Sequence, residues 1–511
     1  MLRESNVIYK KRYSLSVAIA YPSLYNVAIS TLSFHMLYFK LNEYSEVYAE
    51  RVVYDKPSSG NGFVSIETSK PLSKFDAIFF SVHYELDYVR LVRMLISSNI
   101  EPRRRKRRKP LIIVGGPCVT SNPYPLFKIA NVIGVGEMEG IVPEVIEALI
   151  KGGEVEDELA GKRGILIPDH IGKVERYWLK DLNNAWSPTL HVLPKEGYEG
   201  IYGRAFLAEV SRGCTNMCLF CLLAYHFCPE RRKDLAKLKR EIERGVELND
   251  VKSVALISSN YPSDSYGIDL LNFIVRDLGL NISIPSIRIE ALNESVLELL
   301  REGGQRIVTI APETGNEGLR FLLNKKVRDE EIFTVLKNAR KLGFRAVKMY
   351  FMYGLPREGK EDLDSIISLV KKVKKLGFND RNSIRISINP FISKTGTPFQ
   401  FADLDSYEEL LLKRKYLYER LSGDPSIRLS GYSPRDAIIQ AIISTGNEEV
   451  GDLLISWASF GTGIGNLRKA MKTYGIKNWN ELYGRYAKKS PLITKFPRLE
   501  KVWNDFLSKE L

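Results

Sequence analysis

Apolar runs alternate with helix-like segments through the first 151 residues. Five runs have the length and composition of buried strands, and they are residues 14–22, 47–55, 76–85, 111–118 and 130–139. Between them, apolar residues recur at helical spacing, as over residues 26–41 and in the segment that ends at Lys151. Strands that alternate with helices predict a doubly wound parallel sheet, which binds ligands beyond the carboxyl ends of its strands.

A second series of strands begins near residue 202. Six apolar runs predict strands here, at residues 205–214, 251–263, 281–292, 305–320, 344–356 and 383–400. Prolines interrupt residues 152–201, which we interpret as a connector, and helical spacing dominates residues 401–511. The expected organisation is therefore an N-terminal domain over 1–151, the connector, a second α/β domain over 202–400 and a helical C-terminal region.

Composition and charge are those of a soluble globular protein. The chain of 511 residues is 44% hydrophobic and 27% charged, which suits two or three domains. An apolar signal core and a stretch long enough to span a bilayer are both absent, so we expect a cytoplasmic protein without a membrane span. The net charge is +14, and Arg103–Lys109 is a run of seven cations. That run fits either a solvated loop or a patch that binds RNA or an anionic lipid surface.

Three of the five cysteines lie within eight residues, and they are the most informative feature of the sequence. Cys214, Cys218 and Cys221 are spaced by four and three, and Phe220 precedes the third. Thiolates hold iron–sulfur clusters, and three ligands for a four-iron cube leave one iron open for a substrate or cofactor. Structural zinc usually takes four ligands, and disulfides are not expected without secretion. We predict a [4Fe–4S] cluster on these three residues, which Cys228 could close as a fourth ligand.

This cysteine spacing resembles the signature of the radical SAM enzymes. In that family the open iron chelates the amino and carboxylate groups of S-adenosylmethionine (SAM), and one electron from the cluster releases a 5′-deoxyadenosyl radical. The resemblance implies a partial (β/α)6 TIM-like barrel over residues 202–400, with its chemistry at the carboxyl ends of the strands. It also implies an electron donor of the ferredoxin or flavodoxin type.

The same resemblance suggests which residues surround SAM. The second barrel strand of many relatives ends in Gly-Gly-Glu, which receives the SAM amino group, and Ser258, Ser259 and Asn260 stand there in this chain. Glu313 matches the position that bonds the ribose hydroxyls, although a carboxylate that caps the following helix is the alternative. Phe391 lies in a loop like the one over adenine and offers a flat face for stacking.

Other polar residues have structural as well as functional interpretations. Strand alternation places Arg288 and Glu290 on one face, either as an ion pair or as contacts at the barrel mouth. Lys348 interrupts an apolar strand and must face a polar interior or a partner. His170 and His191 lie in the connector, where we expect them to be exposed and not to bind a metal.

The N-terminal domain resembles the Rossmann-like cobalamin-binding domain that precedes many radical SAM cores. The turn at Gly115 and Gly116 and the turn at Gly136 are the most similar pieces. The first loop, YPSLYNVAIS, lacks the Asp-x-His-x-x-Gly motif that supplies a cobalt ligand. The resemblance therefore allows a cobalamin site without that histidine, or a degenerate domain that only shapes the substrate site. Glycines at strand ends are also common for packing alone.

Several runs also resemble an uncharacterised family of fused radical SAM proteins, namely SVHYEL, GGPC, SRGCTNMCLFC, IPSIRIE, APETGN and YFMYGLP. We predict a cobalamin-dependent methyltransferase that acts on an unactivated carbon of an unknown substrate: tRNA, a lipid, a protein side chain or a small metabolite. One alternative is a methylthiotransferase or another RNA-modifying enzyme without cobalamin. Methylthiotransfer normally needs three N-terminal cysteines, and only Cys118 lies there. The other alternative is a non-catalytic iron–sulfur redox sensor or an RNA-binding protein.

Overall fold

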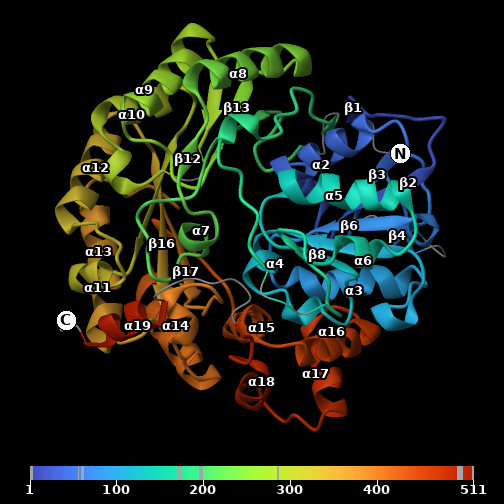
Figure 1. Cartoon of the computed structure of the whole chain (residues 1–511). Helices are drawn as coiled ribbons and strands as arrows, with labels where there is room; N and C mark the ends of the chain where they lie inside the picture. The colour runs from blue at the N-terminus through green and yellow to red at the C-terminus, as the bar shows by residue number, and fades with distance from the viewer. Residues whose placement is uncertain are drawn as a thin grey trace. The chain divides into compact units, whose positions relative to one another are not determined.

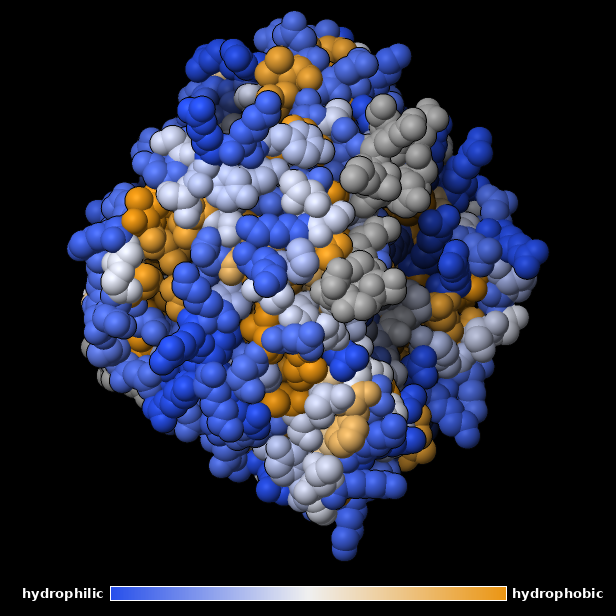
Figure 2. Space-filling view, turned by 90° about the vertical axis from the view of Figure 1, so that its right-hand side faces the viewer, coloured by the Kyte–Doolittle hydropathy of each residue, from blue (hydrophilic) through white to orange (hydrophobic). Residues whose placement is uncertain are grey.

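Two compact units make up the chain in the computed structural model. The structure describes residues 4–55, 57–58, 62–170, 172, 174–194, 199–284, 287–491 and 499–508. The first unit comprises residues 1–207, 247–250 and 442–496, and the second comprises 208–246, 251–441 and 497–511. Hydrophilic residues cover most of the face seen in Figure 2, and hydrophobic residues occur there in separate groups. Within the described residues, no helix combines the length and apolar character that crossing a membrane requires.

A six-stranded sheet forms the centre of the first unit. Its strand order is β3 (Val47–Val53), β2 (Leu15–Tyr21), β6 (Ala77–Ser81), β7 (Leu111–Gly115), β8 (Val132–Gly134) and β9 (Ile165–Leu166). The first five strands are parallel, and β9 closes one edge antiparallel. Every residue of β2 is buried, as expected for a parallel strand with both faces covered. The predicted doubly wound sheet is confirmed.

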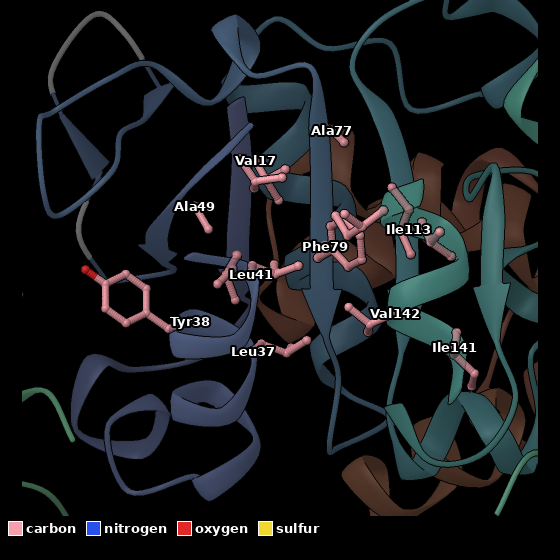
Figure 3. Close-up of a cluster of buried hydrophobic side chains, with 14 of the residues drawn as sticks. Val17, Leu37, Tyr38, Leu41, Ala49, Ala77, Phe79, Ile113, Ile141 and Val142 are labelled. Atoms are coloured by element: carbon pink, nitrogen blue, oxygen red, sulfur yellow. The ribbon is translucent and has the colours of Figure 1, made fainter. Parts of the chain in front are cut away.

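Helices pack on both sides of this sheet (Figure 1), with α2 (Leu32–Glu43) and α5 (Met138–Lys151) on one side and α3 (Asp87–Ser97) on the other. Figure 3 shows part of the core on the α2 and α5 side. Each large aliphatic side chain buried in such a core contributes roughly 1.5–3 kcal/mol of transfer free energy. The labelled residues of this cluster are Val17, Leu37, Tyr38, Leu41, Ala49, Ala77, Phe79, Ile113, Ile141 and Val142.

The strand order also identifies where a ligand would bind. In chain order the five parallel strands lie as 2-1-3-4-5, so the direction of winding reverses between β2 and β6. Open α/β sheets bind ligands in the crevice outside the carboxyl ends of the strands at this reversal. Tyr21 and Ser81 end those two strands, and Gly115 pairs with Ser81 across to β7.

The second unit is a β/α arrangement in two sheets. The first holds β12 (Arg231–Arg232), β11 (Phe206–Arg212), β13 (Ser253–Ser258) and β14 (Asn281–Ser283); the second holds β15 (Ile307–Glu313), β16 (Ala346–Tyr353), β17 (Ile384–Pro390) and β18 (Ile427–Ser430). The strands of the second sheet are all parallel. The connecting helices lie on the outer side of the strands (Figure 1), and they include α8 (Leu235–Asn249), α10 (Glu294–Glu302), α12 (Asp329–Lys341), α13 (Lys360–Lys375) and α14 (Tyr407–Leu421). This arrangement matches the expected TIM-like fold.

Two elements of this unit differ from the predicted ones. The strand expected over 281–292 ends at Ser283, and Arg288 and Glu290 lie at a 3-10 turn (Ile289–Ala291) where they form an ion pair. The sequence placed the two residues on one face because alternate residues of a strand point the same way. In the structure a tight turn brings them together instead. Strand β18 lies within the region expected to be helical. Its four residues are too few to show a strand period in the sequence.

The C-terminal helices are shared between the two units. Helices α16 (Glu449–Phe460), α17 (Ile464–Thr473) and α18 (Trp479–Tyr486) belong to the first unit, where α16 packs against α3. Helix α19 (Leu499–Ser508) belongs to the second unit and packs on the 3-10 turn at Pro398–Phe401. The region is mainly helical, as predicted, but it does not form one separate body.

Candidate functional site

The cysteine loop follows β11 and begins at a glycine that no other residue could replace without a shift. Gly213 has φ of 85°, and a Cβ built there would lie 2.5 Å from the Phe227 carbonyl oxygen and 2.7 Å from that of Pro229. A left-handed backbone and this close approach both require glycine. The turn at Gly213 therefore starts the loop at the carboxyl end of the first barrel strand, as the sequence predicts.

A second segment braces the loop from behind. The Asn324 amide donates hydrogen bonds to the carbonyl oxygens of Asn216 (2.9 Å) and Met217 (3.0 Å). The Leu219 backbone N–H donates to the Leu323 carbonyl oxygen at 3.1 Å. These contacts fix the loop backbone at Asn216, Met217 and Leu219, between the first and third cysteines.

The Cys221 thiol lies near those of Cys214 and Cys218, since it interacts electrostatically with each. Cys218 is 7% exposed, and Cys214 and Cys221 are partly buried. Burial raises the pKa of the Cys218 thiol to about 11, and nearby Lys325 and Arg288 oppose that shift. Burial also raises the pKa of Cys221, although backbone N–H groups of the following helix turn donate to its sulfur. A coordinated metal deprotonates such thiols outright, so this set of donors fits a metal cluster.

A single metal ion would need several ligands that lie close together. Among the residues that the structure describes, no three His, Cys, Asp or Glu side chains gather closely enough to hold one metal ion. Cys228 lies beyond the short helix α7 (Leu222–His226) and is partly buried.

Glu313 lies beside the cysteine loop. It ends β15 after a register shift that follows Ile310, and its φ of 71° is rare for a residue other than glycine. Its carboxylate is 3.8 Å from the Lys325 ammonium, and burial raises its pKa. Its charge also acts on Cys218 and Cys221. The helix that follows is capped by the side chain of Asn316, which accepts a hydrogen bond from Leu319 N, so Glu313 does not serve as that cap.

The polar residues at the end of β13 include atoms with and without hydrogen-bond partners. Ser258 Oγ is 2.7 Å from Ser211 Oγ and accepts a hydrogen bond from Asn260 N at 3.2 Å. Ser259 lies between them and is partly exposed. The Asn260 Oδ1 atom is buried without a hydrogen-bond partner among the described residues. An unsatisfied buried acceptor is costly, and it fits an N–H donor such as a ligand ammonium group.

Phe391 lies in the core beneath the loop. It is 1% exposed and packs edge-to-face against Phe399 at 5.6 Å between ring centroids. The same cluster includes Leu219 of the cysteine loop and Leu323 of the bracing segment. Phe391 therefore supports the loop, and its predicted stacking on adenine stays a prediction.

The three glycines predicted for the N-terminal site play different parts. A Cβ on Gly116 would lie 2.0 Å from the Val82 carbonyl oxygen, and one on Gly136 would lie 2.1 Å from that of Tyr177. Both glycines have positive φ and are needed for close packing of protein backbone. A Cβ on Gly115 would meet nothing within 4 Å, so Gly115 alone faces open space at the strand ends.

His83 is a residue at this edge to which the sequence assigned no role. It follows β6 and stacks on Tyr21, with 5.8 Å between ring centroids. Its Nε2 atom is 3.1 Å from both Ser33 Oγ and Ser81 Oγ. Burial lowers its pKa to about 4, so the ring is neutral at neutral pH. Its place directly after an apolar strand was the available signal.

The prediction that His191 is exposed is wrong. The residue is 1% exposed, and its ring stacks between His35 and Phe206, each at 4.7 Å between centroids. Its Nδ1 atom accepts a hydrogen bond from Leu207 N at 3.4 Å. Burial of the ring between two aromatic faces outweighs the polar character that suggested a loop. His170 is exposed, as expected, and lies 3.4 Å from Asp157.

Most cations of the run Arg103–Lys109 have partners within the first unit. The buried Arg107 guanidinium donates to the carbonyl oxygens of Glu101 (2.7 Å) and Ile129 (2.7 Å), among others. Arg104 and Arg105 pair with Asp169. Lys109 lies 3.5 Å from Asp76 and Arg103 3.8 Å from Asp452. The contacts of the run therefore mainly stabilise the conformation of its own loop. Binding of nucleic acid by the run stays a prediction.

Comparison with known proteins agrees with this geometry. Residues 33–166 match the family described as radical SAM proteins, N-terminal, and residues 208–370 match the radical SAM superfamily. An uncharacterized protein of Methanocaldococcus jannaschii is 32% identical over 440 residues, which cover 86% of this chain and 90% of that one. The chain belongs to the radical SAM superfamily. A [4Fe–4S] cluster and SAM are the cofactors of this superfamily, and its enzymes require a reductant.

Solved structures of two radical SAM enzymes share the fold. The methyltransferase TsrM from Kitasatospora setae, with cobalamin and a [4Fe-4S] cluster bound, has a TM-score of 0.51 at 15% identity over 73% of this chain and 75% of that chain. The cobalamin-dependent enzyme OxsB, with aqua-cobalamin and SAM bound, has a TM-score of 0.51 at 16% identity over 81% of this chain and 57% of that chain. At these identities the likeness shows the fold alone.

Proposed function

We propose that this radical SAM enzyme is a cobalamin-dependent methyltransferase that acts on an unactivated carbon. One observation carries the proposal: a single chain joins the three-cysteine loop to a 2-1-3-4-5 sheet with open space at Gly115, beside the reversal of winding. Ligands bind at such a reversal. The fold shared with TsrM and OxsB, whose structures contain cobalamin, supports the same assignment.

The residues of the second unit would hold the cluster and SAM. When bound, the cluster supplies the electron that cleaves SAM, and the corrin supplies the methyl group. Cys214, Cys218 and Cys221 would hold the cluster as thiolates. Asn260 Oδ1 would accept a hydrogen bond from the SAM ammonium group, which satisfies an acceptor that otherwise lacks a partner. Glu313 would accept hydrogen bonds from the ribose hydroxyls, and Lys325 opposes the rise that burial causes in the pKa of that carboxylate.

The residues of the first unit would hold the corrin at the strand ends. Gly115 leaves space for a ligand to approach the backbone of β7. His83 presents a neutral imidazole at the neighbouring strand end, fixed by Ser33 and Ser81. Gly116 and Gly136 position the surrounding turns without reaching the ligand.

The test uses the full chain, purified and reconstituted without oxygen. We expect corrin absorption bands beside those of the cluster, and we expect 5′-deoxyadenosine from SAM under dithionite. An intact cluster without SAM cleavage would contradict the radical mechanism. An intact cluster that cleaves SAM but retains no added hydroxocobalamin would reject the cobalamin subtype. The Cys228→Ala variant is the control that retains the cluster, and Cys221→Ala is the variant that loses it.

A radical SAM enzyme without cobalamin is the second candidate. The observation that favours it is the packing of Gly116 and Gly136 against protein backbone, which explains two of the three glycines without a ligand. Methylthiotransfer within that class is disfavoured because Cys118, which is buried, stands without two further N-terminal cysteines.

A further inference from the structure

Three cations lie in one row across the second sheet of the barrel unit. Lys348 of β16 pairs in register with Arg385 of β17, and Arg385 pairs with Arg428 of β18. Register partners in a parallel sheet point to the same face. The row is therefore a cationic stripe about 10 Å long, since neighbouring strands lie about 4.8 Å apart. We call these three residues the basic row.

The basic row lies on the inner face of the sheet. The opposite face of β16 carries Met349, Phe351 and Tyr353, all fully buried. Tyr353 interacts electrostatically with Arg414 and Tyr418 of α14, which places that face under the outer helices. Burial alternates along β17 in the same way, with Arg385 exposed between buried isoleucines. The row therefore faces away from the helices.

The neighbouring acids that the structure describes do not neutralise the row's charges. None of the three cations forms an ion pair with a carboxylate among the described residues. The acids that precede β17 and β18 form ion pairs with other cations: Asp380 with Arg340, and Asp424 with Lys374. Like charges directly opposite on neighbouring strands destabilise a sheet. A favourable interaction of these cations must therefore compensate for their mutual repulsion.

Structural explanations account for only part of the row. A charged residue on an edge strand prevents pairing with other chains, and this explains Arg428. The Lys348 ammonium lies 4.8 Å from the Tyr350 ring centroid, a contact that offsets some of its burial. Arg385 lies on a strand paired on both sides, with neither explanation available.

The chemistry of the row favours phosphate. Two guanidinium groups and an ammonium group match the oxygens of adjacent phosphates, which Arg binds in bidentate fashion. SAM also carries a carboxylate, but in this superfamily the open iron chelates it. Proteins that bind a nucleic acid backbone make many phosphate contacts along its length, whereas three cations within about 10 Å suit one diphosphate.

Above the row, the same face carries hydroxyls. Tyr350, Ser387 and Ser430 occupy the next register line towards the carboxyl ends. Those ends lie five residues beyond Lys348 on β16, which is about 16 Å of extended strand. A ligand anchored at the row would therefore reach the strand ends only if it were elongated.

We propose that the basic row binds the diphosphate end of an elongated small-molecule substrate. The proposal rests on the proposed function, since it names the class of substrate that the methyltransferase would modify. Arg385 and Arg428 would chelate the phosphate oxygens, and Lys348 would add a point charge at the buried end of the row.

The test measures binding of inorganic pyrophosphate to the reconstituted full chain by calorimetry. We expect Arg385→Gln and Arg428→Gln each to weaken binding roughly tenfold or more, the scale of a lost charge-assisted hydrogen bond. Lys341→Gln removes an exposed cation at the end of α12 and is the matched control, expected to stay within about twofold. Arg385→Lys should recover part of the affinity if the variant defect is loss of charge and not of folding.

Three results would overturn the proposal: no pyrophosphate binding, equal binding by the row variants and the wild type, or an equal loss in Lys341→Gln. A single-stranded RNA that displaces pyrophosphate far more tightly, and loses affinity in Arg385→Gln, would assign the row to nucleic acid instead. Failure of the proposed function would appear separately, as a wild-type protein without a cluster or corrin chromophore.

Discussion

Single residues decide how each candidate site is built. Gly115 and Gly116 are adjacent at the end of β7, yet one faces open space and the other lies against the Val82 carbonyl. Glu313 adopts a left-handed backbone and thereby brings its carboxylate to the cysteine loop. The Oδ1 atom of Asn260 is buried and has no hydrogen-bond partner among the described residues. Adjacent residues in the chain can therefore have quite different surroundings.

The two glycines give a matched stability test. Gly116→Ala should lower the free energy of unfolding by about 2 kcal/mol or more, because the new Cβ meets a backbone oxygen and φ is 132°. Gly115→Ala should change it by less than about 0.5 kcal/mol. Urea unfolding of both variants measures the difference, and equal effects would contradict the packing that we describe.

His83 should make stability depend on acid pH. Burial lowers its pKa to about 4, below the ordinary value of 6.5, so the folded state binds its proton more weakly than the unfolded state. The stability it contributes is complete above pH 6.5 and is lost as the pH falls towards 4. The loss should be on the order of 1–2 kcal/mol, given the partial exposure of the ring.

The His83→Gln variant should therefore show a flatter stability profile between pH 4 and pH 7, measured by thermal unfolding. Some dependence will remain, because the pKa of buried His35 is also lowered to about 4. A profile for His83→Gln as steep as that of the wild type would refute this role.

At the scale of elements, loops without regular structure fix the geometry. The cysteine loop depends on the segment at Leu323 and Asn324 for its backbone hydrogen bonds. The loop that carries the run Arg103–Lys109 is held by its own arginines, which donate to the carbonyl oxygen of Glu101 just before the run and to those of Phe127 and Ile129 in a second segment. Charged side chains here replace the hydrogen bonds that strands and helices make for themselves.

The basic loop offers a direct test of that role. Arg107→Gln should cost about 2 kcal/mol of unfolding free energy, because several buried carbonyl groups lose a charged donor. Lys106→Gln, at an exposed neighbour in the same run, should be nearly neutral. If Lys106→Gln proved as harmful in denaturant unfolding, the run would act by its overall charge and not by these contacts.

At the scale of the whole molecule, the chain forms two compact units. The first unit has its own core between the sheet and helices α2 and α5 (Figure 3). The second has a separate core beneath the cysteine loop, where Leu219 packs with Phe391 and Phe506. Cofactor binding in one unit should therefore stabilise mainly that unit.

Removal of the cluster should show this separation. After anaerobic chelation of iron, hydrogen exchange should accelerate in peptides that contain Leu219, Leu323 and Phe391. Peptides from β2 and β6 should exchange at unchanged rates, since their core shares no residue with the loop. Equal acceleration in both units would show that the cluster stabilises the chain as one cooperative body.

Local patterns were enough to predict the cofactor chemistry and most strands. Cys214, Cys218 and Cys221 lie within one loop, and a thiolate set that close in sequence is close in space whatever the rest of the chain does. Parallel strands such as β2 and β16 are visible in the sequence as mainly apolar runs, which is again a local signal. The positions of Arg288, Glu290 and His191 were misread because a tight turn or an aromatic stack leaves no period in the sequence.

Only the tertiary structure could decide which residues share a site. The sequence by itself determined a radical SAM cysteine loop, the order of two α/β domains and the absence of the cobalt-ligand motif. The fold decided that Glu313 and Lys325 stand beside the loop, that His83 enters the strand-end edge of the first sheet, and that Lys348, Arg385 and Arg428 form one row. The physical reason is that strand register and long-range packing join residues far apart in the chain, and no local spacing encodes those pairings.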